Sequence, residues 1–332
     1  PPPPPPHFQA EDGIRDKQIC LVGSEMCIRD RAKKPDPLLT RIGQYTGNLM
    51  LRALIWLALL LPYETRVRWM GGLVARVLGP LARFDKRVRD NLNLVCPELP
   101  KAEVDRLSRA VLDNAGRTVM EFYSGAEFIE RAKQAKIGGP GFATLEAAQA
   151  NRQPVIFVTA HFGNYDVVRA HLIARGFTIG GLYRKMSNPY FNTHYVRNLK
   201  SIGTPVFEQG RRGTMEMVRY LRDGGTLGIL TDVHVHGGAD LMFFGHPAVT
   251  STVTAELALK YKAILIPIYA IRQPDGFDFE ITVQEPITHS DPETMTQDVN
   301  DGLEALVRQQ MDQWFWIHRR WKPYIMPDQT DV

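Results

Sequence analysis

The chain lacks the sequence patterns of several common protein classes. It has three cysteines in 332 residues, with no CxxC pair and no Cys/His spacing typical of a metal site. This excludes a disulfide framework and favours a reducing, cytosol-facing setting. The chain also has no G-x-S-x-G nucleophile elbow, no Walker A loop and no G-x-G-x-x-G loop. We therefore expect neither a covalent intermediate on the enzyme nor a bound cofactor.

Net charge is small, at +4, so nothing in the overall charge indicates a nucleic-acid partner. The distribution is uneven, because residues 31–95 hold 12 Lys and Arg against 4 Asp and Glu. This basic segment contains the most apolar stretch of the chain, a combination typical of attraction to an anionic membrane surface. An ordinary basic helical surface is the alternative.

No apolar run is long enough to be an evident membrane span. Residues 53–61 are uninterrupted apolar residues, but Arg52 precedes them and Pro62 ends the run. A spanning helix needs about 20 such residues. We expect residues 38–61 to form a helix that lies in or dips into the membrane interface. A short spanning anchor and a buried core helix remain open.

Residues 1–30 have no amphipathic period and begin with six prolines. Parts of the segment, EDGIRD and LVGSEMCIRD, resemble translated sequencing-adapter sequence, and a natural disordered tail is the alternative. We treat residues 1–30 as a non-native or disordered segment and leave them out of the fold.

The rest of the chain predicts an α/β fold, with a mostly parallel central sheet flanked by helices and an N-terminal helical membrane-associating region. Apolar spacing predicts helices throughout residues 66–131. Strands and helices then alternate, which is typical of a parallel sheet covered on both faces. Strands are expected at 155–160, 178–183, 205–207, 226–231, 263–271 and 279–283, and helices at 165–175, 189–201, 214–222, 251–261 and 299–314. Residues 136–325 would form the core and pack with the helical residues 31–135 as one domain.

His161 and Asp166 are the clearest candidates for chemistry. The apolar strand at 155–160 delivers His161 to the carboxyl edge of the sheet, where open α/β sheets place their active sites. Asp166 follows five residues later, across a turn, and is expected to reach back to one ring nitrogen. The other nitrogen could then take a proton from a hydroxyl. The alternative is a strand-end histidine beside an acidic residue in the first turn of a helix.

Further candidates follow other strands. Arg184 has the planar fork that suits a phosphate or carboxylate, with a surface salt bridge as the alternative. Arg211 lies in a Gly-flanked turn that enters a helix, where backbone N–H groups and the helix dipole favour a phosphate, with a solvated loop as the alternative. Arg319 and Arg320 follow tryptophans, a pattern that suits a membrane interface or, alternatively, a packed C-terminal helix. Asp232 ends a strand beside His234 and His236, and these three could instead form a metal site.

The motif HFGNYD at 161–166 resembles the H-x4-D/E motif of the lysophospholipid acyltransferase superfamily, and its flanks resemble the lipid A biosynthesis lauroyl/myristoyl acyltransferase family. Four more blocks resemble that family in the same order. They are DNAGRT at 113–118 with Glu121 and Phe122, LYRKMSNP at 182–189, FFGHPA at 243–248 with Thr250, and WIHRRWK at 316–322. The family often has Glu where this chain has Asp166, so the acceptor is less closely defined than the reaction.

The resemblance implies transfer of a fatty acyl chain from acyl carrier protein to a hydroxyl of a lipid A precursor of the Kdo-lipid IVA type. His161 would act as general base and Asp166 as its partner, without a metal. Asp232 would organise Arg184 or the acceptor. The enzyme would lie on the cytoplasmic face of the inner membrane. Substrate binding is assigned to Asn164, Arg184, Arg211, Asp232 and Arg319. The alternatives are a glycerolipid or phosphatidylinositol mannoside acyltransferase and, from another class, a metal-dependent hydrolase built on His234, His236 and Asp232.

Overall fold

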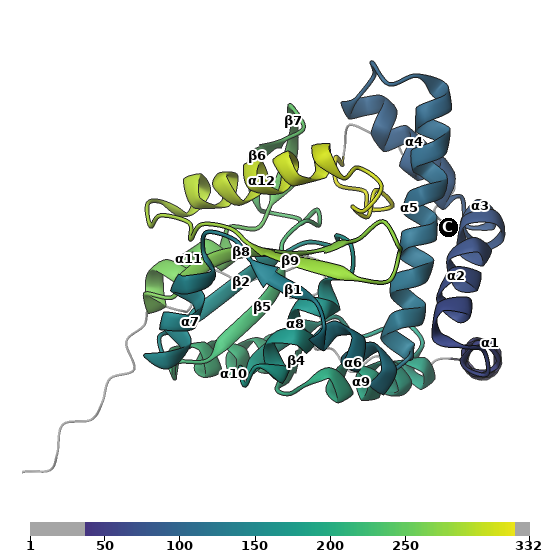
Figure 1. The fold of residues 1–332 in the computed structure, drawn as a ribbon, viewed down its shortest axis with the longest axis horizontal. Coiled ribbons are helices and arrows are strands. Elements are labelled where there is room, and N and C mark those ends of the chain that lie inside the picture. Colours follow the sequence, from purple (N-terminus) through teal and green to yellow (C-terminus); the bar gives the residue numbers. More distant parts are fainter. Residues whose placement is uncertain (1–36, 323–332) are drawn as a thin grey trace, which may run out of the picture.

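The computed structural model describes residues 37–322. The interpretation of residues 1–30 therefore lies outside the described part of the chain. Within it, helices and a mostly parallel sheet confirm the predicted α/β class (Figure 1).

The N-terminal third is helical, as predicted. Its elements are α1 (Leu38–Leu59), α2 (Tyr63–Leu73), the π-helical turn η2 (Val74–Leu78), α3 (Gly79–Leu81), α4 (Phe84–Val95), α5 (Lys101–Tyr123) and α6 (Ala126–Lys133). The helices α2 and α5 pack closely at Gly116. A Cβ there would lie 2.6 Å from the Met70 carbonyl oxygen, so only glycine permits this approach. This contact between α2 and α5 helps to hold α5 in place beside the sheet (Figure 1).

The central sheet has seven strands in the order β1-β9-β8-β2-β5-β3-β4. Their bounds are β1 (Lys136–Gly138), β2 (Val155–Thr159), β3 (Ile179–Tyr183), β4 (Val206–Glu208), β5 (Thr226–Leu230), β8 (Ile264–Arg272) and β9 (Phe279–Val283). Every neighbouring pair is parallel except β8 with β9. The strand β2 is buried along its whole length, as its continuous apolar run predicts.

Helices cover both faces of the sheet. The helices α8 (Tyr165–Ala174) and α9 (Pro189–Ile202) pack on the face that carries Phe157. The helices α10 (Arg211–Arg222) and α11 (Val253–Tyr261) pack on the opposite face, against Ile156 and Val158. The remaining elements are α7 (Phe142–Ala150), α12 (Pro292–Gln309) and a hairpin of β6 (Ala239–Phe243) and β7 (His246–Thr250). The strands β1, β6 and β7 and the helix α7 were not predicted.

The boundaries of α12 and α11 differ from the prediction. The last helix begins at Pro292 rather than at 299, because the Asp291 side chain accepts hydrogen bonds from the backbone N–H groups of Glu293 and Thr294. It ends at Gln309, well before 314. The helix α11 begins at Val253, after Thr252, rather than at 251.

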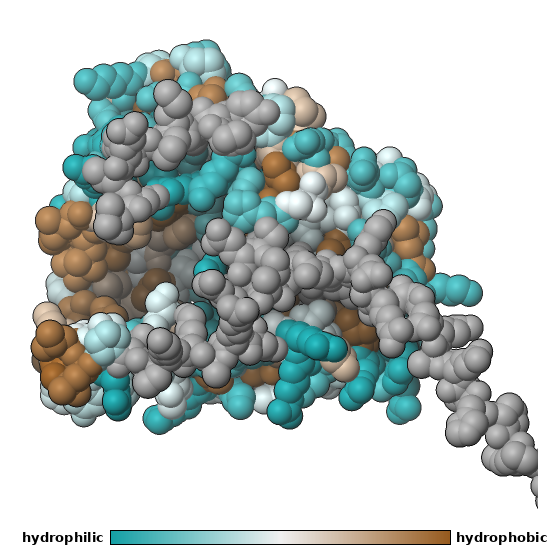
Figure 2. All heavy atoms as spheres, turned by 180° about the vertical axis from the view of Figure 1, so that it is seen from behind, coloured by the Kyte–Doolittle hydropathy of each residue, from teal (hydrophilic) through white to brown (hydrophobic). Residues whose placement is uncertain are grey.

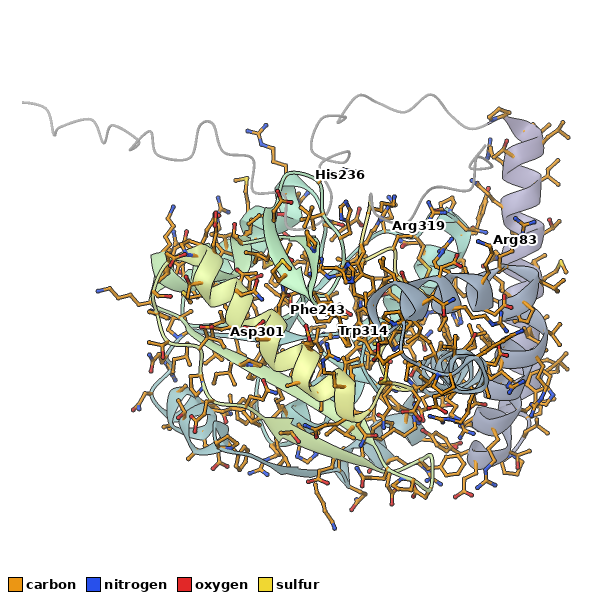
Figure 3. The ribbon with its side chains drawn as sticks, turned by 90° about the horizontal axis from the view of Figure 1, so that it is seen from above. Arg83, His236, Phe243, Asp301, Trp314 and Arg319 are labelled. Atoms are coloured by element: carbon orange, nitrogen blue, oxygen red, sulfur yellow. The ribbon has the colours of Figure 1, made fainter. Side chains whose placement is uncertain are left out.

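The C-terminal tryptophans form a second core rather than a membrane-facing surface or a helix. Trp314, Trp316 and Trp321 are fully buried and pack against Phe243 and Phe244. Figure 3 labels Trp314 and Phe243 of this cluster. Arg320 is also buried, and its guanidinium donates to the Val249 carbonyl and to Thr250 Oγ1. The interfacial interpretation of this segment is therefore wrong. The aromatic cluster joins the sequence block at 243–250 to the segment 314–322, which contains the block at 316–322.

The helix α1 is largely exposed although it is apolar. Only Asn48, Ile55 and Ala58 are buried within it, which excludes the buried core helix. We call the apolar side chains exposed on α1, α2 and α3 and on the α1–α2 turn the α1–α3 apolar surface; they include Leu39, Met50, Trp56, Leu57, Leu60, Trp69 and Leu81. Figure 2 shows hydrophobic side chains gathered along this edge of the molecule, at the left. Within residues 37–322, no helix combines the length and apolar character needed to cross a membrane.

Candidate active site

The turn after β2 places His161 at the carboxyl edge of the sheet. Gly163 adopts φ of +53°, and a Cβ there would lie 2.0 Å from the Ala270 carbonyl oxygen. Only glycine fits this position. The Gly163 N–H donates to the Gln313 carbonyl at 2.9 Å, and the Phe315 N–H donates to the His161 carbonyl at 2.9 Å. The C-terminal segment therefore holds the turn from one side.

A buried polar network from α5 and β8 holds the same turn from the other side. The Gly163 carbonyl accepts hydrogen bonds from Asn114 Nδ2 and from Thr118 Oγ1. One turn along α5, the fully buried Glu121 forms a two-pronged ion pair with the Arg272 guanidinium. Glu121 also accepts a hydrogen bond of 2.8 Å from Asn164 Nδ2. The block around residues 113–122 thus supports the turn that carries His161.

The acid partner of His161 is Asp232, at the end of β5. Asp232 Oδ1 lies 2.9 Å from His161 Nδ1, and Asp232 Oδ2 accepts a bond of 2.9 Å from the His161 backbone N–H. Trp314 Nε1 donates to the same Oδ2 at 3.0 Å. Asp232 is therefore fixed by three contacts and fixes the ring of His161 in turn. This corrects the prediction that Asp232 organises Arg184 or the acceptor.

The charge state of Asp232 follows from these contacts. Burial acts to raise the pKa of its carboxyl, but the charge and hydrogen bonds of His161 outweigh burial and hold the pKa well below its usual range. The ring of His318 lies edge-on to the ring of His161, with centroids 4.5 Å apart. Burial lowers the pKa of His318 to about 3, and His161 acts in the same direction. Asp232 is thus ionised and His318 neutral near pH 7.

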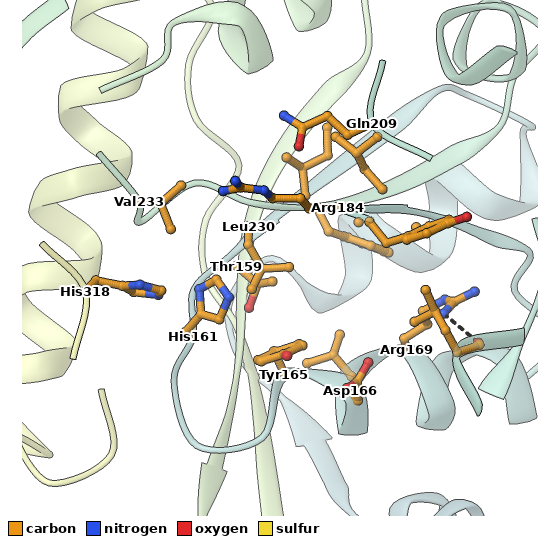
Figure 4. Close-up of a pocket in the computed structure, with 18 of the residues that line it drawn as sticks. Thr159, His161, Tyr165, Asp166, Arg169, Arg184, Gln209, Leu230, Val233 and His318 are labelled. Atoms are coloured by element: carbon orange, nitrogen blue, oxygen red, sulfur yellow. Dashed lines mark hydrogen bonds between the residues drawn. The ribbon is translucent and has the colours of Figure 1, made fainter. Parts of the chain in front are cut away.

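Asp166 does not make the contact that was predicted for it. No hydrogen bond joins Asp166 to His161 among the described residues, and the ring of Tyr165 lies between the two (Figure 4). Asp166 is buried, and burial raises the pKa of its carboxyl to about 6 against the opposing charges of Arg169 and His161. Its influence on His161 is therefore through charge, and the predicted pairing across the turn is wrong.

Asn164 is a structural cap in this arrangement. Its side-chain oxygen accepts a hydrogen bond from the Asp166 N–H at the start of α8, and its amide donates to Glu121. The residue is fully buried. Its side chain is thus occupied by the fold, which argues against the predicted role in substrate binding.

A cavity of about 820 Å³ opens beside His161. This size is ordinary for a small-molecule or cofactor site. Polar groups gather around the sheet edge, where Arg184 and His318 lie near His161 (Figure 4). The lining at this mouth also includes Gln209, His234, His236, Arg319 and Lys322. The structure therefore brings the predicted residues Arg184, Asp166 and Arg319 to one cavity with His161.

Arg211 lies elsewhere. It is the exposed first residue of α10, and it is not part of the cavity wall. The neighbouring Gln209 does line the cavity, so the Gly-flanked turn approaches the mouth without presenting Arg211 to it.

The predicted metal alternative is not assembled as proposed. The rings of His234 and His236 meet edge to face, but in the described part of the chain the group able to hold a metal ion is His161, Asp232 and His318. Their ligand atoms all lie within 4.8 Å of one another. Two imidazoles and a carboxylate suit a divalent transition metal chemically. Such an ion would displace the hydrogen bond between His161 and Asp232.

Comparison with known proteins identifies the family of the chain. The model of the bacterial lipid A biosynthesis acyltransferases matches residues 34–323, and the chain belongs to this family. One curated relative is a lipid A biosynthesis lauroyltransferase of Escherichia coli (strain K12). It is 25% identical over 279 residues, covering 81% of this chain and 89% of the relative. The protein is therefore an acyltransferase of lipid A biosynthesis, and its acceptor belongs to the lipid A precursors.

Sequence reasoning missed three residues of the site. His318 was noticed only as part of the block at 316–322, and Glu121 only as part of the block before the motif. Arg272 had no signal beyond a charge at the end of an apolar strand. The available sign of Glu121 and Arg272 was a charged residue on an otherwise apolar strand or helix face. Such a residue is normally buried together with an oppositely charged partner.

Proposed function

We propose that His161 is the general base of a direct acyl transfer, held in place by Asp232. The observation that carries this is the contact of 2.9 Å between His161 Nδ1 and Asp232 Oδ1 at the mouth of the cavity. A buried carboxylate on one ring nitrogen fixes the tautomer and stabilises the imidazolium that forms when the other nitrogen takes a proton. Asp166 adds negative charge to the same cavity without touching the ring.

The reaction follows from this base. His161 removes the proton of a lipid hydroxyl, and the oxygen attacks the carbonyl carbon of an acyl thioester. The C–S bond breaks as the ester forms, and the proton held on His161 passes to the leaving thiolate. Arg184, Arg319 and Lys322 supply positive charge at the mouth, where it favours an anionic acceptor and the developing oxyanion.

For substrates, we propose acyl carrier protein as donor and a phosphorylated glucosamine disaccharide of the Kdo-lipid IVA type as acceptor. The family supports a lipid A precursor, and the name of the Escherichia coli relative points to a lauroyl chain in that protein. The cationic mouth suits the phosphates of such an acceptor.

We also propose that the α1–α3 apolar surface rests on the cytoplasmic face of the inner membrane. Leu39, Met50 and Trp56 are all more than half exposed there, which is unusual for a surface that meets only water. Arg52 lies on the same helix, and the basic segment 31–95 would attract anionic lipid. Residues 31–135 would then be the membrane-associated region and residues 136–325 the catalytic core of one domain.

A purified enzyme offered matched donors and acceptors tests this function. We expect transfer from acyl carrier protein to a Kdo-lipid IVA type acceptor, and much slower transfer to lysophosphatidate or phosphatidylinositol mannoside. Coenzyme A thioesters serve as the second donor. Activity confined to a glycerolipid or a phosphatidylinositol mannoside would contradict the acceptor assignment without affecting the role of His161.

The cluster of His161, Asp232 and His318 calls for one control on metal chemistry. A general base needs a free ring nitrogen, so acyl transfer should survive treatment with a chelator. Loss of activity with chelator and its return with Zn²⁺ would favour a metal-dependent reaction instead.

A further inference from the structure

The cavity beside His161 continues inward between the sheet and the helices α8 and α9. Its inner wall includes Phe157 of β2 and Ile179 of β3, and its roof includes Val168 of α8 and Leu199 of α9. These residues belong to the core on the α8 and α9 face of the sheet. The cavity therefore runs from a polar mouth into a mainly apolar interior.

Two glycines make part of its floor. Gly228 of β5 pairs in register with Phe157 of β2 on one side and with Gly181 of β3 on the other. Residues in register in a parallel sheet point to the same face, so all three face the cavity. Both glycines line it. Two adjacent strands thus carry no side chain at one level of the sheet, which leaves a trough across the floor.

The trough has space for small side chains. A Cβ on Gly228 would lie 3.6 Å from Ile179 Cγ2, and a Cβ on Gly181 would lie 3.5 Å from Arg169 Cζ, both ordinary van der Waals distances. Neither glycine has a positive φ. The backbone therefore does not demand glycine at these positions, and packing of the protein itself does not demand it. The space above Gly228 is left for something that enters the cavity, and the Arg169 guanidinium bounds it above Gly181.

We propose that this trough receives the distal part of the transferred acyl chain, and that Gly228 and Gly181 set the longest chain the enzyme accepts. The inference rests on the proposed acyl transfer at His161. Phe157 lies four residues before His161, so the trough begins roughly 13 Å from the base along the strand direction at about 3.3 Å per residue. A chain whose thioester carbon is at His161 would reach the trough only with its far carbons.

The Arg169 guanidinium closes the trough at its Gly181 end, where a Cβ on Gly181 would lie 3.5 Å from Arg169 Cζ. Arg169 donates through Nη1 to the Leu199 carbonyl at 3.2 Å, and its Nη2 donates to the Gly203 carbonyl, so its guanidinium is tied to the end of α9. Arg169 is buried. A polar, immobile wall at this depth opposes further extension of an apolar chain, because burying an unmatched guanidinium against hydrocarbon is unfavourable.

The test is the acyl-length profile of Gly228→Ala, Gly228→Val and Gly181→Ala. Each variant is assayed with acyl carrier protein carrying C8, C10, C12, C14 or C16 chains and one acceptor. The matched control is Gly138→Ala, in β1 of the same sheet, where a new Cβ meets nothing within 4 Å. Binding of the same donors to each variant combined with His161→Ala gives a readout without turnover.

We expect the preferred chain to become shorter, most in Gly228→Val. For the longest chain that the wild type accepts, kcat/KM should fall by about 10-fold or more relative to shorter chains, the usual effect of one methylene in a fitted apolar pocket. Gly138→Ala should keep the wild-type profile. Equal loss for all chain lengths, or an unchanged profile, would overturn the inference. A wild type that transfers no chain at all would contradict the proposed function instead.

Discussion

His161 Nδ1 and Asp232 Oδ1 lie 2.9 Å apart although 71 residues separate them in the chain. The parallel sheet explains the meeting, because β2 and β5 are neighbours and both end at the same edge. We predict that Asp232→Asn lowers kcat by about 10³–10⁴, since an amide can hold the wrong tautomer of the ring and cannot stabilise its charge. Asp166→Asn should lower kcat much less. Steady-state kinetics on both folded variants would decide, and a larger loss in Asp166→Asn would restore the pairing across the turn.

The pKa of Asp166 predicts a pH-dependent stability. Its carboxyl has a pKa of about 6 in the folded protein and an ordinary value of 3.8. The folded state therefore holds the proton more tightly, and its stability falls as pH rises from about 4 to about 6. Asp166→Asn removes this loss, so its Tm relative to the wild type should rise across that window and stay level above it.

The size of this effect is up to about 3 kcal/mol, at roughly 1.4 kcal/mol per pKa unit. Thermal unfolding between pH 4 and 8 measures it. Asp240→Asn, which changes an exposed carboxylate on β6, is the matched control substitution. A Tm difference that does not vary with pH for Asp166→Asn would contradict the raised pKa.

The ion pair between Glu121 and Arg272 should be costly to break from one side. Glu121→Gln leaves a buried guanidinium without its counter-charge, and such a change costs about 3–5 kcal/mol. The double variant Glu121→Gln with Arg272→Gln should recover part of that loss. Urea unfolding gives the free energies. Glu103→Gln, which breaks the exposed pair with Arg106, is the control and should change stability little. Strict additivity of the two buried changes would contradict a coupled pair.

The α1–α3 apolar surface should bind anionic vesicles. Trp56→Glu with Leu60→Glu removes two exposed apolar side chains, each worth about 1.5–3 kcal/mol when fully buried, so vesicle affinity should fall by at least about tenfold. Met242→Glu changes an apolar side chain on β6 that is 45% exposed, against 60% for Trp56 and 64% for Leu60, and should leave binding intact. Co-sedimentation with phosphatidylglycerol-containing vesicles makes the comparison. Equal binding by all three proteins would place the membrane contact elsewhere.

Local sequence patterns predicted an element well where a short apolar run or one apolar helix face determines its structure. The buried strand β2, the helices α8 and α9 and the placement of His161 all follow from short apolar runs and their turns. The small strands β6 and β7 had no such run, because one side of the hairpin is exposed. The start of α12 was missed since its N-cap, Asp291, lies in a segment without apolar spacing.

The sequence predicted residues that line the site, but not which acidic residue pairs with His161. Proximity in sequence favoured Asp166 as the partner of His161, whereas tertiary structure places Asp232 there. Which of two acidic residues reaches a histidine depends on strand order and on the direction of the first helical turn, and neither is visible in a motif. The aromatic core around Trp314 was missed for a similar reason, because burial of a tryptophan depends on what packs over it.

The most direct test of the central claim is acyl transfer by His161→Ala. The side chain is part of the cavity wall, and its removal leaves Asp232 without the ring that it orients. If His161 is the general base, kcat should fall by about 10²–10⁴ or more in a protein that still folds and binds its acyl donor. Transfer at the wild-type rate by folded His161→Ala protein would contradict the account.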